Sequence, residues 1–220
     1  MKTNERGLFM SENMIINALI LGLTVIVICV VALNTRKHKH KQEALNRKFL
    51  DDEAAANQVR KKEIDPQLYF TPDLTDLPPI EEDDPHKVIR AAARQMIYFK
   101  KPVTNLELKN QYGPAQMDLI ALHEENFNEY LKALTAWATS LAETDNEQDI
   151  SDALLILGYA IAHGSEFRNT YKLTADIYAR MGEKETLIAL KETAEINHFR
   201  DPAIRHHIVE HIEKKIEGLG

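Results

Sequence analysis

The sequence has one cysteine, eight glycines and no basic residue between positions 63 and 85. The lone Cys29 excludes an intramolecular disulfide and suits a reducing compartment. After residue 35 there is no glycine-rich phosphate loop, no Gly-x-Ser-x-Gly turn and no Cys–His pair. Residues 86–220 carry sixteen basic and twenty acidic residues, so they lack the basic surface that nucleic-acid binding requires. We therefore expect no enzyme activity, no cofactor and no nucleic-acid partner.

The chain begins with a long uncharged run, 23 residues from Asn13 to Thr35. At about 1.5 Å per helical residue, this run can cross a hydrocarbon core of about 30 Å. Two Lys/Arg residues precede it and six follow within 15 residues. The positive-inside rule then predicts a single-pass protein of the cell membrane, with its N-terminus outside and its C-terminal part in the cytoplasm. A signal peptide cleaved near Ala32 is the alternative, but the run is long for a signal core and most of the positive charge follows it.

Composition changes divide the chain into five predicted segments. Residues 36–62 have a net charge of +5 and no Gly or Pro, whereas residues 63–85 have a net charge of −8. The basic part favours a helix whose cations can contact anionic lipid headgroups. The predicted segments are a short extracytoplasmic N-terminus (1–13), a transmembrane helix (14–35), a basic juxtamembrane helical neck (36–64), an acidic Pro-rich linker (65–85) and a helical domain (86–220).

The acidic linker carries an apolar pattern as well as five prolines. Proline at this density favours polyproline II, which has three residues per turn. Leu74, Leu77 and Ile80 recur at that period and so share one face. We expect this strip to dock into a groove of its own domain or of a partner. The alternative is a flexible acidic tether in which these residues have no partner.

Helical signals fill the rest of the chain, and no segment has the alternating pattern of a strand. Asn105 is the expected cap of a short helix, and Asp149 or Ser151 that of a later one. Pro and Gly residues mark most of the expected ends. The predicted helices cover 86–98, 105–112, 114–143, 149–163, 166–181, 183–197 and 202–217, which makes the fold all-α.

Part of this helical region resembles tetratricopeptide repeats (TPR). Trp137 and Tyr171 are 34 residues apart, and so are Ala160 and Ala194, which is the length of one such repeat. Further positions agree with the pattern: Ala153 and Leu157 in the first unit, and Ala175, Tyr178 and Gly182 in the second. The resemblance covers about residues 134–201. Some residues depart from the TPR pattern, among them Leu141, Lys191 and Phe199. The structural alternative is therefore an irregular helical bundle.

The resemblance implies antiparallel helical hairpins of the α-solenoid type, with a groove that binds a protein or peptide. By position in the repeat, the groove would be lined by Lys132, Thr139, Asn169, Lys172, Asp176 and Arg180. The expected function is a membrane-anchored adaptor or scaffold that presents this domain to the cytoplasm. The sequence leaves the identity of the partner and the oligomeric state open.

Two other functions compete with this interpretation. Ala18 and Gly22 form a small-xxx-small pair, which would allow a structural subunit of a membrane complex to assemble through its transmembrane helix. His207, Glu210 and His211 spell H-x-x-E-H, the pattern of a metal-dependent hydrolase. Only nine residues follow that pattern, which leaves no downstream helix for a third, acidic ligand. We therefore predict no metal site there.

Overall fold

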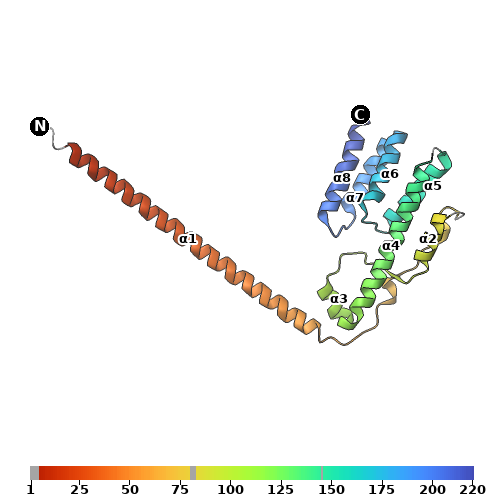
Figure 1. The fold of residues 1–220 in the computed structure, drawn as a ribbon, viewed down its shortest axis with the longest axis horizontal. Coiled ribbons are helices and arrows are strands. Elements are labelled where there is room, and N and C mark those ends of the chain that lie inside the picture. The colour runs from red at the N-terminus through yellow and green to blue at the C-terminus, as the bar shows by residue number, and fades with distance from the viewer. Residues whose placement is uncertain (1–4, 80–82, 145) are drawn as a thin grey trace. The chain divides into compact units, whose positions relative to one another are not determined.

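The computed structural model describes residues 5–79, 83–144 and 146–220, with only the backbone described at some positions of the first two helices (Figure 1). The chain forms two units, Met1–Ala55 and Ala56–Gly220. It is 74% helical and 2% strand, which confirms the all-α class. The predicted border between linker and domain at residue 85 is not where the second unit begins.

The first unit consists of α1 (Glu5–Ala56). No helix in the described part of the chain combines the length and the apolar character needed to cross a membrane. The predicted transmembrane helix at 14–35 falls mostly on residues whose side chains lie outside that part. Beyond it the basic residues are exposed, and Lys39 and His40 lie 4.0 and 3.6 Å from Glu43.

The helix predicted for the neck ends at Ala56 rather than at residue 64. The chain after it belongs to the second unit and is irregular because its backbone bonds to α3 and to the turn that follows α3. The Lys62 amide donates to the Tyr112 carbonyl at 3.0 Å, and the Lys62 carbonyl accepts from Gln116 Nε2 at 2.7 Å. Ile64 is buried beside Tyr112. These contacts outweigh the helical propensity of the neck sequence.

The second unit contains seven α-helices in its described residues, joined by short turns. Figure 1 shows α4 as the longest of them, with α5 to α8 at one end and α3 at the other. The helices are α2 (Asp83–Ala92), α3 (Asn105–Tyr112), α4 (Met117–Ala142), α5 (Glu147–Ala162), α6 (Arg168–Met181), α7 (Lys184–Ile196) and α8 (Pro202–Glu217). Three 3₁₀ turns, η1 (Pro66–Leu68), η2 (Leu74–Asp76) and η3 (Pro114–Gln116), complete it.

A small sheet that we did not predict joins the start of this unit to the segment after α2. Strands β1 (Tyr69–Phe70) and β2 (Met96–Ile97) pair antiparallel, with Tyr69 opposite Ile97 and Phe70 opposite Met96. The helix predicted over 86–98 therefore ends at Ala92. Strands of two residues are too short to show an alternating pattern, which is why the sequence gives no sign of them.

Two predicted helix caps are wrong by a few residues. Thr104, not Asn105, caps α3, since its hydroxyl accepts from the Glu107 amide while the Glu107 carboxylate accepts from the Thr104 amide. Asn146 caps α5 by accepting from the Gln148 amide at 3.0 Å, in place of Asp149 or Ser151. In both cases a residue just upstream has the extended backbone that a cap requires.

The core of the second unit follows the order of its helices. α4 packs on α2 and α5, α5 on α6, and α8 on both α6 and α7. The largest apolar cluster lies between α4 and α5 and includes Tyr130, Trp137 and Tyr159. A second cluster, around Tyr171, Leu187 and Ile208, lies between α6, α7 and α8. The aromatic residues at the centre of these clusters, Tyr130, Trp137, Tyr159 and Tyr171, are all buried.

Candidate functional site

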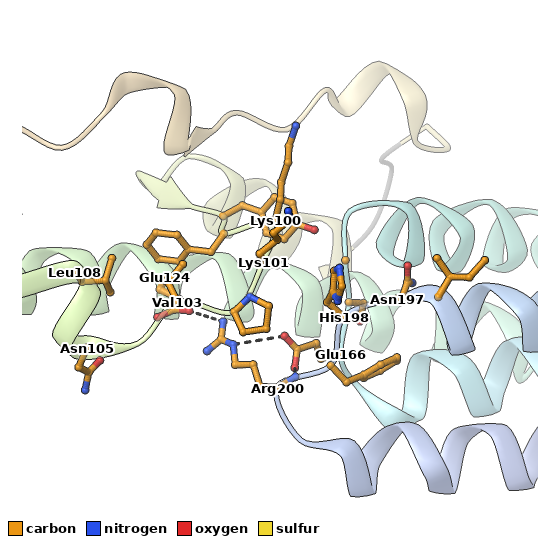
Figure 2. Close-up of a pocket in the computed structure, with 17 residues that line it drawn as sticks. Lys100, Lys101, Val103, Asn105, Leu108, Glu124, Glu166, Asn197, His198 and Arg200 are labelled. Carbon is orange, nitrogen blue, oxygen red and sulfur yellow. Dashed lines mark hydrogen bonds and ion pairs between the residues drawn. The ribbon is translucent and has the colours of Figure 1, made fainter. Parts of the chain in front are cut away.

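Two depressions on the second unit are candidate binding sites. The larger, here called the loop cleft, has a volume of about 470 Å³ and lies between the irregular segment 98–103 and residues 196–200, which are the last residue of α7 and the turn after it (Figure 2). The smaller, the helix cleft, has a volume of about 380 Å³ and lies between α4 and the start of α6. Both are shaped by turns that the packing of α4 against α5 and α6 holds in place.

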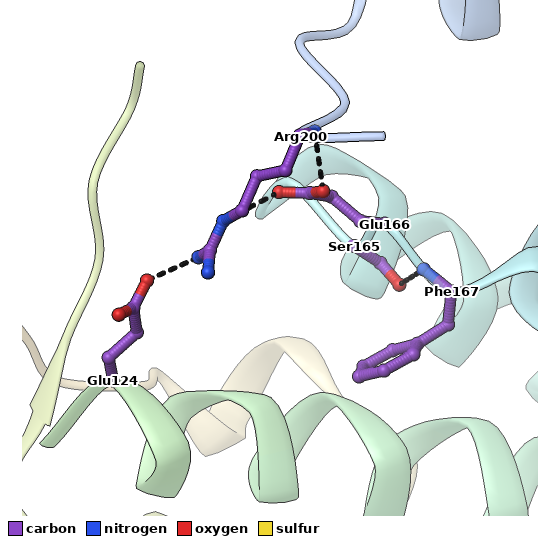
Figure 3. Close-up of polar contacts among 5 residues, drawn as sticks. All are labelled: Glu124, Ser165, Glu166, Phe167 and Arg200. Atoms are coloured by element: carbon purple, nitrogen blue, oxygen red, sulfur yellow. Dashed lines mark hydrogen bonds and ion pairs between the residues drawn. The ribbon is translucent and has the colours of Figure 1, made fainter. Parts of the chain in front are cut away.

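Arg200 joins three separate parts of the chain at the loop cleft (Figure 3). Its guanidinium contacts the Glu124 carboxylate of α4, and its Nε lies 3.4 Å from Glu166 Oε1. The Arg200 amide also donates to Glu166 Oε2 at 2.8 Å. One side chain thus ties the turn before α8 to α4 and to the turn before α6.

Buried hydroxyl groups hold the turn between α5 and α6 in place. Thr170 Oγ1 lies 2.9 Å from Thr135 Oγ1 of α4 and 3.1 Å from Ser165 Oγ. Ser165 Oγ in turn accepts from the Phe167 amide at 3.4 Å. All three hydroxyl residues are buried, so the turn between α5 and α6 is held against α4 by satisfied polar groups.

Burial controls the ionisation of the tyrosines near the loop cleft. The pKa of Tyr98, which lines it, is raised by burial and further by the charge of Glu166. Burial raises the pKa of Tyr171 to about 12, although a hydrogen bond from Asn197 Nδ2 at 2.8 Å partly opposes that rise. Both side chains are therefore neutral phenols at neutral pH.

The helix cleft brings together three of the residues predicted to line a groove: Lys132, Thr139 and Asn169. Lys132 Nζ lies 2.7 Å from Glu129 and 5.9 Å from the centre of the Phe167 ring. The hydrogen bond with Glu129 is the main cause of the raised pKa of Lys132. The site therefore offers a cation next to an aromatic face, with two neutral polar side chains beside it.

The other three predicted groove residues lie elsewhere. Asp176 is bound to α8, 2.9 Å from His211 Nε2 and 2.8 Å from Lys215 Nζ. Burial raises the pKa of Asp176, but its hydrogen bonds with Lys215 and His211 lower it by more, so the net shift is downward. Lys172 is half-buried and Arg180 is exposed, and neither lines one of the two clefts.

The apolar strip of the predicted linker lies within the second unit, in a segment of residues 57–79 that we call the strap. Leu77 is buried in the main core and Leu74 packs against it, while Ile80 lies outside the described residues. The strap is not a continuous polyproline II helix as predicted. Asp65 and Asp73 instead accept hydrogen bonds from amides two residues ahead, at 2.9 Å each, and so begin 3₁₀ turns.

The H-x-x-E-H residues of α8 do not converge on one point. His207 is exposed, with its Nδ1 3.8 Å from Glu210 Oε2, whereas His211 faces Asp176 of α6. No group of three or more potential metal ligands occurs in the described part of the chain. For Ala18 and Gly22, the small pair of the first unit, only the backbone is described.

Comparison with known proteins does not assign this chain to a family. No family model matches it, and comparisons with curated proteins and with solved structures found no match either. The likeness to TPR units is therefore not confirmed by any relative, and the function has to be argued from the residues and their geometry.

Sequence reasoning missed the loop cleft. Its lysines, Lys100 and Lys101, stand beside Pro102 in a break between helices, and Arg200 stands close to Pro202 in another. Charged residues at these two breaks between helices were the only sign of the loop cleft in the sequence. The pairing of Arg200 with Glu124, 76 residues earlier, depends on how α4 packs and has no local sequence pattern.

Proposed function

We propose that this protein is a membrane-anchored protein-interaction module, in which a TPR-like helical unit binds a protein or peptide partner on the cytoplasmic side. The proposal assigns it no catalytic step. Its partners are a protein ligand at the helical unit and lipid at the anchor and basic neck. The supporting arguments differ for each part of the chain.

Membrane anchoring is supported by the sequence. The uncharged run at 14–35 has the length of a membrane span, and the block from Arg36 to Lys41 follows it directly. That asymmetry supports a cytoplasmic location for everything after residue 35. Alkaline carbonate extraction is the test: the full chain should stay in the membrane pellet, and a variant lacking 14–35 should be released. Release of the full chain would contradict the anchor.

The likeness to TPR units is supported by where the repeat positions lie. Trp137 and Tyr171, 34 residues apart, are both buried, and so are Ala160 and Ala194. The second TPR-like repeat begins at residue 168, where α6 begins, and its two helices are α6 and α7. Small buried residues let antiparallel helices approach closely, which is their role in such hairpins. The first TPR-like repeat departs from the pattern because α4, its first helix, ends early, at Ala142.

The observation that carries the binding proposal is the helix cleft. Lys132 and Asn169 are 37 positions apart, and repeat register alone predicted that they share a groove with Thr139. They line one depression, beside the ring of Phe167. A cation near an aromatic face and two neutral polar groups is a surface that suits a peptide with both polar and apolar side chains.

Site-specific photocrosslinking in the full chain tests this site. A photoreactive amino acid at Thr139 or Asn169 should yield a discrete crosslinked partner in the membrane fraction. The matched control is Leu155, which is exposed on α5 and lines neither cleft. Equal crosslinking from all three positions, or none from Thr139 and Asn169, would contradict binding at the helix cleft.

A further inference from the structure

The loop cleft has features of a second binding surface that the proposed groove does not explain. Its wall at 196–200 exposes Ile196, of which 76% is accessible, and the facing wall exposes Val103 at 38%. Figure 2 shows Val103 and Arg200 among the side chains that line the cavity. Leu108 forms part of the lining and is buried. The cleft therefore offers an apolar seat between two chain segments.

The charge at the loop cleft is opposite in sign to that of its surroundings. Glu124 and Glu166 are both engaged by Arg200. Lys100 and Lys101 have no ion-pair partner among the residues that the structure describes, and both are exposed. These five residues sum to one net positive charge, whereas residues 86–220 together carry a net charge of −4. The unpaired cations favour an anionic ligand.

Several backbone amides of both walls lack a hydrogen-bond partner in the described part of the chain. Among the described residues, no hydrogen bond engages the amides of Phe99, Lys100 or Lys101, nor those of His198 and Phe199. An extended peptide can supply the missing acceptors from its own backbone. A small rigid anion would satisfy the lysines but would leave both the apolar seat and these amides without partners.

We infer that the loop cleft binds an extended acidic segment of a partner protein, with an aliphatic or aromatic side chain seated between Val103 and Ile196. The carboxylates of the segment face Lys100 and Lys101. This inference rests on the proposed function and adds a second site with its own ligand chemistry. Arg200 is a positioning residue in this arrangement, because its two carboxylate contacts hold the wall at 196–200 in place.

The test begins with a phage-displayed library of random peptides, selected on the full chain purified in mild detergent. Enriched peptides should carry Asp or Glu next to an aliphatic or aromatic residue. A fluorescein-labelled peptide from this set should bind roughly tenfold more weakly to Lys100→Glu/Lys101→Glu, and its affinity should fall as salt is raised. Enriched peptides without acidic residues would overturn the inference.

Two matched controls separate the site from general effects. Arg90→Glu/Arg94→Glu makes the same change in charge at two exposed cations that do not line the loop cleft, one on α2 and one in the turn just after it, and it should leave affinity unchanged. Ile196→Asp should weaken binding about tenfold, whereas Ile188→Asp, at a residue 43% exposed on the same helix, should not. Equal losses in a variant and its control would overturn the inference.

The same experiment distinguishes failure of this inference from failure of the proposed function. Peptides that bind the full chain but respond only to Thr139→Glu or Asn169→Glu would leave the interaction module standing and remove the loop-cleft site. No enrichment above that on an unrelated helical protein would remove both.

Discussion

Asp176 links α6 to α8 through an ionisable side chain. It accepts from both His211 and Lys215, and these hydrogen bonds hold its pKa below the ordinary value of 3.8. A carboxylate with a lowered folded pKa stabilises the fold above the unfolded pKa, and that stabilisation is lost as pH falls through the folded value. The effect is modest because the side chain remains 40% exposed.

Asp176→Asn should therefore lower the free energy of unfolding by less than about 1 kcal/mol at neutral pH. The difference from the wild type should persist down to about pH 4 and shrink below it. Urea unfolding followed by the fluorescence of Trp137, the only tryptophan, measures both. The control is Glu192→Gln on α7, an exposed residue with no partner among the described residues. A difference that grows on acidification would contradict the assignment.

Two glycines with left-handed backbone angles provide a matched pair. Gly164 has a φ of 79° and Gly182 one of 76°, so alanine is strained at either position by about 1 kcal/mol. At Gly182 a Cβ would meet nothing within 4 Å, but at Gly164 it would lie 2.2 Å from Tyr98 Oη. The Tyr98 ring is packed against Phe127, with centres 4.9 Å apart, and cannot easily withdraw.

We expect Gly164→Ala to destabilise the protein by about 1–3 kcal/mol more than Gly182→Ala, since it adds overpacking to the same backbone strain. Chemical denaturation of the two variants gives the comparison. Removing the Tyr98 hydroxyl, as Tyr98→Phe, should recover part of the extra loss in the Gly164→Ala background but none in the Gly182→Ala background. Equal destabilisation by the two alanines would mean that Tyr98 moves aside.

At the scale of elements, the strap depends on Phe70. Its ring packs edge-on against Phe127 at 5.1 Å and against His163 at 5.2 Å, and it lies next to the backbone bond from the Tyr98 amide to the Leu68 carbonyl. These contacts join the strap to both α4 and α5. The neighbouring Thr71 is exposed and makes no such contact.

Phe70→Ala should destabilise the unit by roughly 2–3 kcal/mol, less than the loss at a fully buried phenylalanine. Hydrogen exchange at the Tyr98 amide should accelerate at the same time, because the strap that accepts its hydrogen bond opens locally. Thr71→Ala should change neither quantity. Slow exchange in Phe70→Ala would show that the 3₁₀ turns and Leu77 hold the strap without the aromatic contact.

The elements that the sequence predicts well are those with local end signals. α3 has its predicted bounds, and α6, α7 and α8 begin or end within two residues of the prediction, because Gly113, Gly182 and Pro202 act through backbone geometry alone. β1 and β2 could not be found in this way. Their pairing depends on contact between residues 26 and 28 positions apart.

The candidate sites also differ in how far local sequence signals predict them. The repeat register assigned Lys132, Thr139 and Asn169 to one groove, and these three residues line the helix cleft. It failed for Asp176, since the register does not say that α8 would cover this residue. The loop cleft is made of turns, whose positions depend on packing between distant helices, so the sequence offered only isolated charges next to prolines.

At the scale of the whole molecule, the boundary of the folded unit is the main point on which sequence and structure differ. Composition places the border at residue 85, where the acidic and Pro-rich stretch ends. The compact unit begins at Ala56, because Ile64, Tyr69 and Leu77 supply parts of its apolar clusters. The acidic side chains of the strap, Glu63, Asp65, Asp73 and Asp76, are exposed, whereas its apolar side chains and Pro78 pack inward.

Two fragments test this boundary. Residues 56–220 should unfold cooperatively at the same urea midpoint as this unit in the full chain. Residues 86–220 should be far less stable, since each large apolar side chain taken from the core removes about 1.5–3 kcal/mol, and the loss of the strap also leaves Met96 and Ile97 uncovered. The reporter is again Trp137, which both fragments retain. If 86–220 unfolds at the midpoint of 56–220, the strap is an accessory to a core that is complete without it.

Adding the strap in trans, as a peptide of residues 57–79, should raise the urea midpoint of 86–220. The midpoint should rise in proportion to the logarithm of the peptide concentration once the peptide is in excess, because the peptide binds the native state alone. A peptide in which Phe70 and Leu77 are replaced by alanine should have no such effect.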